Sequence, residues 1–285
     1  MRVSEPLSLV NLERYPISAL DSAPIGHLVT DVRSQLAVKG CAVLDGFIDS
    51  SQLERMAEET AALALHAYFS RAQATAYGGA PDESYPERHP RRRILERENG
   101  FVAGDAIGLN TNLRQIYHSP ALKGFLALCL EVRDLYEFAD PIAQLVINVV
   151  KPNGKHAWHF DSNEFVATIM TQPAEQGGEF QYVPNIRRPG DENYQAVQAI
   201  LEGGSSDMHT LDLRPGDLQL FFGRYSLHRV SQTSGARDRH TAVLAYSNEP
   251  GVLGKAEKTS RLYGRKLSSH DAADNQRMRD DRLID

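Results

Sequence analysis

The stretch Arg214-Pro215-Gly216-Asp217-Leu218-Gln219-Leu220-Phe221 joins a tight turn to a short apolar strand. Adjacent Pro and Gly residues mark a turn, and the run that follows has the length and composition of a buried strand. Residues 143–250 repeat this arrangement, with turn signals between short strand-like runs. The predicted strands cover residues 144–150, 157–170, 178–183, 210–213, 217–222 and 240–246. Many short strands joined by turns favour a mainly β fold with a jelly-roll core.

The first 142 residues are predicted to support this core with helices. Within residues 24–39, Leu28, Val32 and Leu36 recur at helical spacing, and Gly40 is suited to end the helix. The other elements predicted here are a short buried strand over 41–47 and helices over about 52–68 and 120–130. Residues 69–110 are rich in Gly, Pro, Arg and Glu, and they are predicted to form a long loop, which is usually functional or disordered.

The composition is that of an ordinary globular protein. The chain has 285 residues, 41% of them hydrophobic and 24% charged, which suits a single domain. We divide this domain into helical support with the long loop (1–142), the jelly-roll core (143–250) and a polar C-terminal segment (251–285). The last segment is compatible with a lid, an arm of a homodimer or a loose tail.

The charge and the cysteines exclude several classes of protein. The net charge of −6 argues against a nucleic-acid-binding surface, and no apolar run is long enough to cross a membrane. The N-terminal residues lack the apolar stretch of a signal peptide. Cys41 and Cys129 stand in apolar surroundings and are predicted to be buried free thiols. These features together predict a cytoplasmic protein.

Trp158-His159-Phe160-Asp161 and the later Leu227-His228-Arg229 contain the residues of a candidate metal site. Side chains two residues apart in a strand share one face, so His159 and Asp161 can meet one ion. A jelly roll can bring the distant His228 beside them. Two histidines and one carboxylate form a facial triad that leaves open positions on Fe(II). The alternatives are a surface pair for His159 and Asp161, and an ordinary core histidine for His228.

Arg239 and Thr241 form a second candidate site, because they share one face of the last predicted strand. A guanidinium offers a rigid fork to a carboxylate, and a threonine hydroxyl can add a further hydrogen bond. The pair therefore predicts an anchor for the remote carboxylate of a cosubstrate that chelates the metal. Arg237 is the competing candidate, and a solvated charge cluster over residues 237–239 is the remaining alternative.

Taken together, these motifs resemble the Fe(II)/2-oxoglutarate-dependent oxygenases. Within that superfamily they resemble a bacterial branch of free-amino-acid hydroxylases related to the radical lysine halogenase. The matching segments are residues 89–92, 158–165, 177–187, 215–221 and 227–230. The resemblance implies a double-stranded β-helix that binds Fe(II) through the two histidines and Asp161. It also implies that Arg239 and Thr241 bind 2-oxoglutarate.

The resemblance further implies hydroxylation of an aliphatic C–H bond with O2, and release of succinate and CO2. The implied substrate is a small polar molecule, most plausibly a free amino acid or a derivative. Halogenases of this branch carry glycine in place of the carboxylate ligand, whereas this chain has Asp161, so hydroxylation is expected. Desaturation or cyclisation are less expected outcomes. Two other hypotheses are a cupin-type metal enzyme that does not use 2-oxoglutarate and a non-catalytic jelly-roll binding module.

Candidates for substrate binding are less well defined. Related enzymes hold substrate with a histidine just before the metal motif, which corresponds to His156, and with an arginine from the upstream loop. The candidate arginines are Arg91, Arg92 and Arg93, for which a solvated basic loop is the alternative. Glu164 is a candidate for holding a substrate cation, for supporting the metal ligands or for serving as a fourth ligand in a cupin-type site. Tyr263 would close the pocket, as an aromatic residue from the C-terminal region does in relatives.

Overall fold

Two antiparallel sheets form the centre of the computed structural model, which describes residues 6–204, 207–274 and 280–284. The larger sheet contains β1 (Cys41–Leu44), β2 (Tyr68–Ala74), β3 (Leu95–Val102), β5 (Leu145–Val150), β7 (Val166–Gln172), β11 (Leu218–Phe221) and β14 (Arg239–Leu244). The smaller sheet contains β6 (His156–His159), β9 (Phe180–Val183), β10 (His209–Leu211) and β12 (Leu227–Val230). Two short pairs join β4 (Tyr136–Glu137) to β15 (Tyr246–Ser247), and β8 (Gln176–Gly177) to β13 (Thr233–Ser234).

The strand order interleaves strands that are distant in the chain. It runs β1-β11-β7-β14-β5-β3-β2 in the larger sheet and β10-β9-β12-β6 in the smaller one. This order, with antiparallel neighbours throughout, is that of a double-stranded β-helix. The predicted mainly β fold with flanking helices is therefore confirmed.

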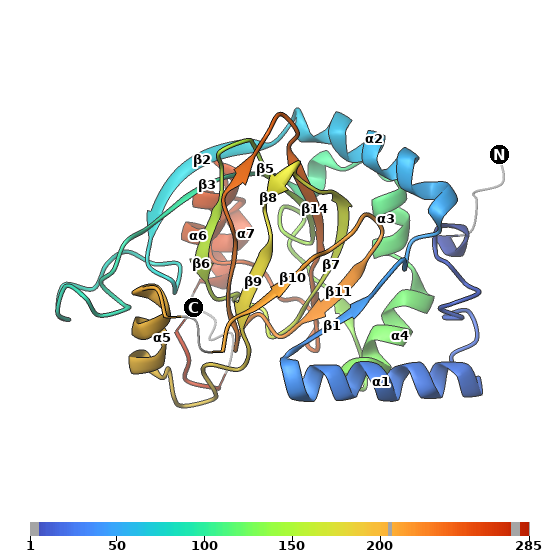
Figure 1. Cartoon of the computed structure of the whole chain (residues 1–285), viewed down its shortest axis with the longest axis horizontal. Coiled ribbons are helices and arrows are strands. Elements are labelled where there is room, and N and C mark those ends of the chain that lie inside the picture. The colour runs from blue at the N-terminus through green and yellow to red at the C-terminus, as the bar shows by residue number, and fades with distance from the viewer. Residues whose placement is uncertain (1–5, 205–206, 275–279, 285) are drawn as a thin grey trace.

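Four helices cover the outer face of the larger sheet (Figure 1), namely α1 (Ala23–Lys39), α2 (Leu53–Ala64), α3 (Asn112–Tyr117) and α4 (Pro120–Leu130). The structure also contains α5 (Tyr194–Leu201), α6 (Ala256–Tyr263) and α7 (Ser268–Ala273). The largest hydrophobic cluster joins α1 to α4 with the larger sheet. Short 3-10 turns occur at Pro6–Leu9, Ser50–Gln52 and Gly104–Ala106. Because helices fill the outer side, the inner side of this sheet is left to form a cavity with the smaller sheet.

The first long helix forms where its spacing predicts it. Ile25, Val32 and Leu36 are among its buried residues, and Pro24 stands in the first turn, where a missing N–H has no cost. Gly40 ends the helix in the left-handed conformation (φ 61°), and its N–H donates to the Leu36 carbonyl. The helix over 120–130 and the strand that begins at Cys41 are confirmed as well, while the second helix ends earlier than predicted, at Ala64.

The prediction of a long loop over residues 69–110 was wrong. This segment contains two long paired strands, β2 and β3, joined by a compact connection over residues 75–94. In β3, Arg97 and Asn99 are buried although both are polar. A half-buried strand is recognised in a sequence by its alternation of apolar and polar residues. The inward side chains of β3 are polar, so this alternation is absent and the strand was not predicted. The connection packs on α5, where the His89 ring lies 4.0 Å from Tyr85 and 4.5 Å from Tyr194.

The strand predicted over 157–170 is interrupted. β6 ends at His159 and β7 begins only at Val166, so Asp161 lies in the intervening turn. The argument that His159 and Asp161 share one face of a single strand therefore does not hold. Their convergence comes from the turn instead.

The polar C-terminal segment contains α6 and α7 and packs on the β-helix. His270 Nε2 lies 2.8 Å from Asp140 Oδ2, and both side chains are fully buried. Asp140 also accepts hydrogen bonds from the backbone N–H groups of Ile142 and Ala143, so this contact ties α7 to the segment before β5. Cys41 and Cys129 are buried and unpaired, as predicted. Within the described ranges, no helix has both the length and the apolar character that crossing a membrane requires.

Candidate metal centre and cavity

His159, Asp161 and His228 converge at one point between neighbouring strands. His159 of β6 stands directly opposite His228 of β12 in the strand register, and their ring centroids are 4.1 Å apart. Asp161 reaches both rings from the turn after β6. Its Oδ1 lies 3.8 Å from His159 Nε2, and its Oδ2 lies 3.4 Å from His228 Nε2. One ligand atom from each residue lies within 4.8 Å of the other two, which suits a single metal ion.

Backbone carbonyls orient both imidazoles. His159 Nδ1 lies 2.8 Å from the Ala157 carbonyl oxygen, and His228 Nδ1 lies 3.0 Å from that of Ser226. Each carbonyl can only accept, so each Nδ1 carries the proton and donates it. The lone pair of each ring then resides on Nε2, the atom that faces Asp161. This is the usual arrangement of metal-binding histidines, whose second nitrogen is held by a hydrogen bond.

The protonation states also suit metal binding. Burial, reinforced by the neighbouring His228, lowers the pKa of His159 to about 3, so its ring is neutral at physiological pH. Burial raises the pKa of the Asp161 carboxyl, but the two histidines and Lys258 bring it well below its usual range. A neutral imidazole and a carboxylate are both ready to coordinate without losing a proton. Two histidines and a carboxylate leave open positions on a six-coordinate iron.

Gly223 makes room for the Asp161 carboxylate. The Asp161 N–H donates to the Gly223 carbonyl oxygen at 3.1 Å, so the two backbones lie side by side. A Cβ atom on Gly223 would lie 1.9 Å from Asp161 Oδ2 and 2.8 Å from its Cγ. No larger residue fits here unless the carboxylate moves.

Gly223→Ala is therefore expected to weaken metal binding while the fold persists. The added methyl group would push the Asp161 carboxylate away from the two Nε2 atoms, and such disturbances around a metal ligand typically reduce affinity by about 10- to 100-fold. Anaerobic titration with Fe(II) or Co(II) measures the change. Gly26→Ala is the matched control, because its added Cβ meets nothing within 4 Å. Equal affinities for the two variants would contradict a constraint at Gly223.

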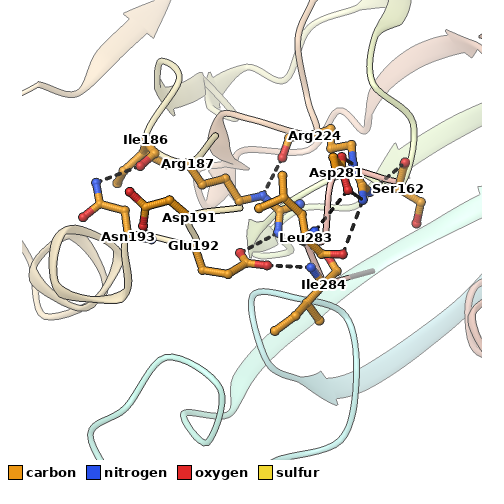
Figure 2. Close-up of polar contacts among 10 residues, drawn as sticks. All are labelled: Ser162, Ile186, Arg187, Asp191, Glu192, Asn193, Arg224, Asp281, Leu283 and Ile284. Carbon is orange, nitrogen blue, oxygen red and sulfur yellow. Dashed lines mark hydrogen bonds and ion pairs between the residues drawn. The ribbon is translucent and has the colours of Figure 1, made fainter. Parts of the chain in front are cut away.

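Two buried arginines brace the turn that carries Asp161 (Figure 2). Arg224 Nη1 donates to the Ser162 carbonyl oxygen at 3.2 Å, and its Nη2 donates to Asp281 Oδ1 at 2.8 Å. Arg187 Nε donates to the Arg224 carbonyl oxygen at 2.6 Å, and its Nη1 pairs with Glu192 at 2.9 Å. Ser162 follows Asp161, and Arg224 follows Gly223. Residues 281–284 are therefore linked through Arg224 to both backbone segments at the turn that carries Asp161.

Asp281→Ala is expected to destabilise the protein by about 3–5 kcal/mol, because it removes a carboxylate that pairs with the buried Arg224 guanidinium. Denaturant unfolding of the metal-free protein would measure this loss. Asp45→Ala is the control, since Asp45 is 65% exposed and pairs with the exposed Arg14. An unfolding free energy within about 1 kcal/mol of wild type would show that the C-terminal contact does not stabilise the fold.

Arg239 is a buried cation that lacks a carboxylate partner among the described residues. Its side chain is 2% exposed, its Nη1 donates to Thr241 Oγ1 at 2.5 Å, and its Nε has no hydrogen-bond partner. Burial lowers its pKa to about 10, so it remains charged at neutral pH. A buried, unpaired charge is costly, and an anion placed beside it would remove that cost. The competing Arg237 is exposed and donates to the Pro173 carbonyl oxygen instead.

A cavity of about 250 Å³ joins the metal group to Arg239 and Thr241. His156 and Tyr263, both predicted to bind substrate, also line it. The His156 ring stacks on His159 with a centroid distance of 3.9 Å. Tyr263 reaches the cavity from α6 and packs 5.8 Å from the Phe101 ring. The structure therefore brings seven of the predicted residues to one cavity.

Four other candidates do not line this cavity, namely Glu164, Arg91, Arg92 and Arg93. Arg92 donates to the Tyr85 carbonyl oxygen within the connection between β2 and β3. The adjacent Arg91 pairs with Asp82 at 2.9 Å. In this conformation the basic stretch stabilises its own connection, and a role in substrate binding stays a prediction.

Several lining residues were missed by the sequence analysis. They include Arg97, Asn148, Thr168, Gln219, Lys258 and Arg261. Asn148 carried a usable signal, because it is a polar residue inside the otherwise apolar strand Leu145–Val150. It lies opposite Thr241 in the register and accepts a hydrogen bond from Asn99 at 2.6 Å. Arg97 carried no such signal, since its strand was predicted to be a loop.

Comparison with solved structures identifies the same fold in oxygenases. An oxidoreductase of the 2OG-Fe(II) oxygenase family from Burkholderia pseudomallei is 17% identical, with a TM-score of 0.50 over 79% of this chain and 92% of that chain. The epimerase SnoN in complex with Fe3+, alpha ketoglutarate and nogalamycin RO is 16% identical, with a TM-score of 0.53 over 78% and 84%. AviO1 from Streptomyces viridochromogenes Tue57 is 13% identical, with a TM-score of 0.54 over 79% and 96%.

Sequence comparison assigns the family. No curated protein matches this sequence. The family model described as HalD: Halogenase D matches residues 26–263, which is most of the chain. This match confirms the predicted relationship to the halogenase branch, and the solved structures confirm the fold. The chain therefore belongs to the Halogenase D family and has the fold of the Fe(II)/2-oxoglutarate oxygenases.

Proposed function

We propose that this protein is an Fe(II)- and 2-oxoglutarate-dependent dioxygenase that hydroxylates an aliphatic C–H bond of a small polar substrate. The observation that carries the proposal is one cavity that holds both the His159, Asp161 and His228 group and the unpaired Arg239 guanidinium. The three ligands would hold iron. Arg239 and Thr241 would hold the remote carboxylate of 2-oxoglutarate. When bound, iron and 2-oxoglutarate supply the oxidising chemistry with O2, and succinate and CO2 are released.

Asp161 favours hydroxylation over halogenation. A halogenase of this type needs a free position for chloride on the iron, whereas here a carboxylate fills the third protein position. The Asp161 oxygens lie within 3.8 Å of both Nε2 atoms, and Gly223 keeps space for them. The family name thus describes relatives, and the ligand set of this chain supports oxygen insertion. Desaturation and cyclisation use the same ligands, and product analysis distinguishes them.

A cupin-type enzyme without 2-oxoglutarate is less well supported. It would need a fourth protein ligand, for which His156 and Glu164 are the candidates. His156 stacks face to face on His159, and Glu164 does not line the cavity. Such an enzyme would also leave the buried Arg239 without an anion. A binding module would likewise have no use for the three converging ligands.

Anaerobic addition of Fe(II) and 2-oxoglutarate tests the proposal directly. We expect a weak visible charge-transfer band that requires both components, because 2-oxoglutarate would chelate the iron through its keto acid end. With O2 and a substrate panel, mass spectrometry should then show succinate together with a product that has gained one oxygen atom. Absence of the band would contradict 2-oxoglutarate chelation, and a chlorinated product would contradict the role of Asp161.

A further inference from the structure

Residues 281–284 are bound to the rest of the protein through their backbone (Figure 2). The Ile284 N–H donates to Glu192 Oε1 at 2.5 Å, and the Ile284 carbonyl oxygen accepts a hydrogen bond from Arg187 Nη1 at 3.1 Å. At the other end of the segment, the Asp281 carbonyl oxygen accepts a hydrogen bond at 2.8 Å from a backbone N–H of the loop before α5. Hydrogen bonds at both ends therefore fix the register of this segment.

Two arginines connect this segment to the residues on either side of Asp161. Arg224 pairs with the C-terminal segment and donates to the Ser162 carbonyl oxygen at 3.2 Å. Arg187 lies over the Phe160 ring, with its guanidinium carbon 3.9 Å from the ring centroid. Both arginines are 1% exposed, and each pairs with a carboxylate. Because their charges are paired, the two arginines act on the turn by packing and hydrogen bonding.

The three ligands differ in how the fold holds them. His159 and His228 lie in paired strands, and backbone carbonyls fix their Nδ1 atoms. Asp161 lies in the turn after β6, and its N–H donates to the Gly223 carbonyl oxygen. A residue in a turn lacks the regular hydrogen bonds of a strand. The position of the Asp161 carboxylate therefore depends on what its two neighbours in the turn contact, and those contacts include the two arginines.

We propose that Arg224 and Arg187 are positioning residues for the metal-binding carboxylate of Asp161, and that Glu192 and residues 281–284 hold them in place. These residues, without Asp161, are named the C-terminal clasp. The inference rests on the proposed function, because it takes the ligand group as the metal site. None of the clasp residues lines the cavity, so the clasp acts on the ligand turn and does not meet the substrate. The metal centre then reaches its binding geometry only when residues 281–284 are docked.

Co(II), used as a spectroscopic probe of the Fe(II) site, tests the proposal without turnover. Asp281→Ala removes the carboxylate that pairs with Arg224, whereas Arg224→Lys keeps the charge but loses the fork that reaches two acceptors. We expect each variant to bind Co(II) about 10- to 100-fold more weakly than wild type, because disturbing the surroundings of a metal ligand has effects of this size. The visible d–d spectrum of the bound Co(II) should also change, because it depends on the geometry of the ligands.

Met56→Ala is the control that separates positioning from stability. Met56 is 1% exposed and belongs to α2, which covers the outer face of the larger sheet. Its truncation leaves a core cavity and should destabilise the fold about as much as the loss of a buried charge partner. Denaturant unfolding of the metal-free variants measures this match. The Co(II) affinity of Met56→Ala should stay within about twofold of wild type, because distant sites act independently, and its Co(II) spectrum should be unchanged.

Three outcomes would overturn the proposal. The first is wild-type Co(II) affinity and spectrum in both clasp variants. The second is an equal loss of Co(II) affinity in Met56→Ala, since the effect would then follow stability. The third is a wild-type protein that binds no Co(II). The charge-transfer band of wild type with Fe(II) and 2-oxoglutarate tests the proposed function separately, because Co(II) binding requires no 2-oxoglutarate.

Discussion

Asp161→Ala is expected to reduce substrate hydroxylation by about 1000-fold or more, equivalent to about 4 kcal/mol of lost transition-state stabilisation. Asp161 is the one carboxylate in the ligand group, and its two oxygens face both imidazoles at 3.8 Å and 3.4 Å. Without it, two histidines remain, which bind Fe(II) weakly and leave its geometry undefined. Product formation and succinate formation are measured with the substrate found by the metabolite panel.

The control and a second variant separate catalysis from folding. Asp134→Ala removes a carboxylate that is 57% exposed, and it should leave the activity unchanged. Asp161→Gly removes the same ligand but leaves more space at the metal, so hydroxylation should also be lost, and added chloride reveals whether halogenation appears. Wild-type turnover by either Asp161 variant would remove this residue from the ligand set. Anaerobic Fe(II) titration shows whether the loss follows from metal binding.

Arg239→Met is expected to raise the concentration of 2-oxoglutarate needed for half-maximal turnover about 100-fold, because truncation of a buried, hydrogen-bonded charge pair costs about 2–5 kcal/mol. In the protein without 2-oxoglutarate, by contrast, the free energy of unfolding should not fall. The variant removes a buried guanidinium that has no carboxylate partner among the described residues, and such a charge is itself unfavourable. Affinity for the cosubstrate and stability of the free protein should therefore change independently.

Thermal unfolding with and without 2-oxoglutarate measures both effects. For wild type, ligand at 100 times its Kd adds about 2.7 kcal/mol of stability, whereas a 100-fold weaker variant gains about 0.4 kcal/mol at the same concentration. Arg237→Ala is the matched control, because Arg237 is nearby but exposed, and it should behave as wild type. An unchanged requirement for 2-oxoglutarate in Arg239→Met, together with a raised one in Arg237→Ala, would reassign the anchor.

The sequence predicted the parts of the site that apolar surroundings make conspicuous. His159 and Asp161 stand among aromatic residues, and Arg239 begins an apolar strand. Burying unpaired polar groups at these positions would cost free energy, so the sequence predicted that they bind a metal or a ligand. The jelly roll was also predictable, because its signals are local in the sequence. These signals are the turn at Pro215-Gly216 and the short strand-like runs after residue 143. The α1 helix was predicted equally well, because its apolar spacing and its terminal Gly40 agree.

The rest depended on contacts between distant segments. β3 was not predicted because its inward face carries polar side chains. Arg97 lines the cavity and donates to Ser70, and Asn99 donates to Asn148. The resemblance implied Tyr263, but the contributions of Lys258 and Arg261 from the same helix could not be predicted, because α6 looks like an ordinary polar helix. Asp281 also gave no signal, since only the folded chain shows that it meets the buried Arg224 beside the ligand turn.

The brace formed by Arg224, Asp281 and Ser162 has a consequence for biosynthesis. A nascent chain that has emerged from the ribosome as far as residue 250 already contains all three proposed ligands and the cosubstrate anchor. It still lacks α6 and the carboxylate of Asp281, so the turn carrying Asp161 has its backbone contact with Gly223 but not the contact that Asp281 makes through Arg224. The ligand group is therefore expected to reach its final rigidity only after residues 281–284 have been synthesised.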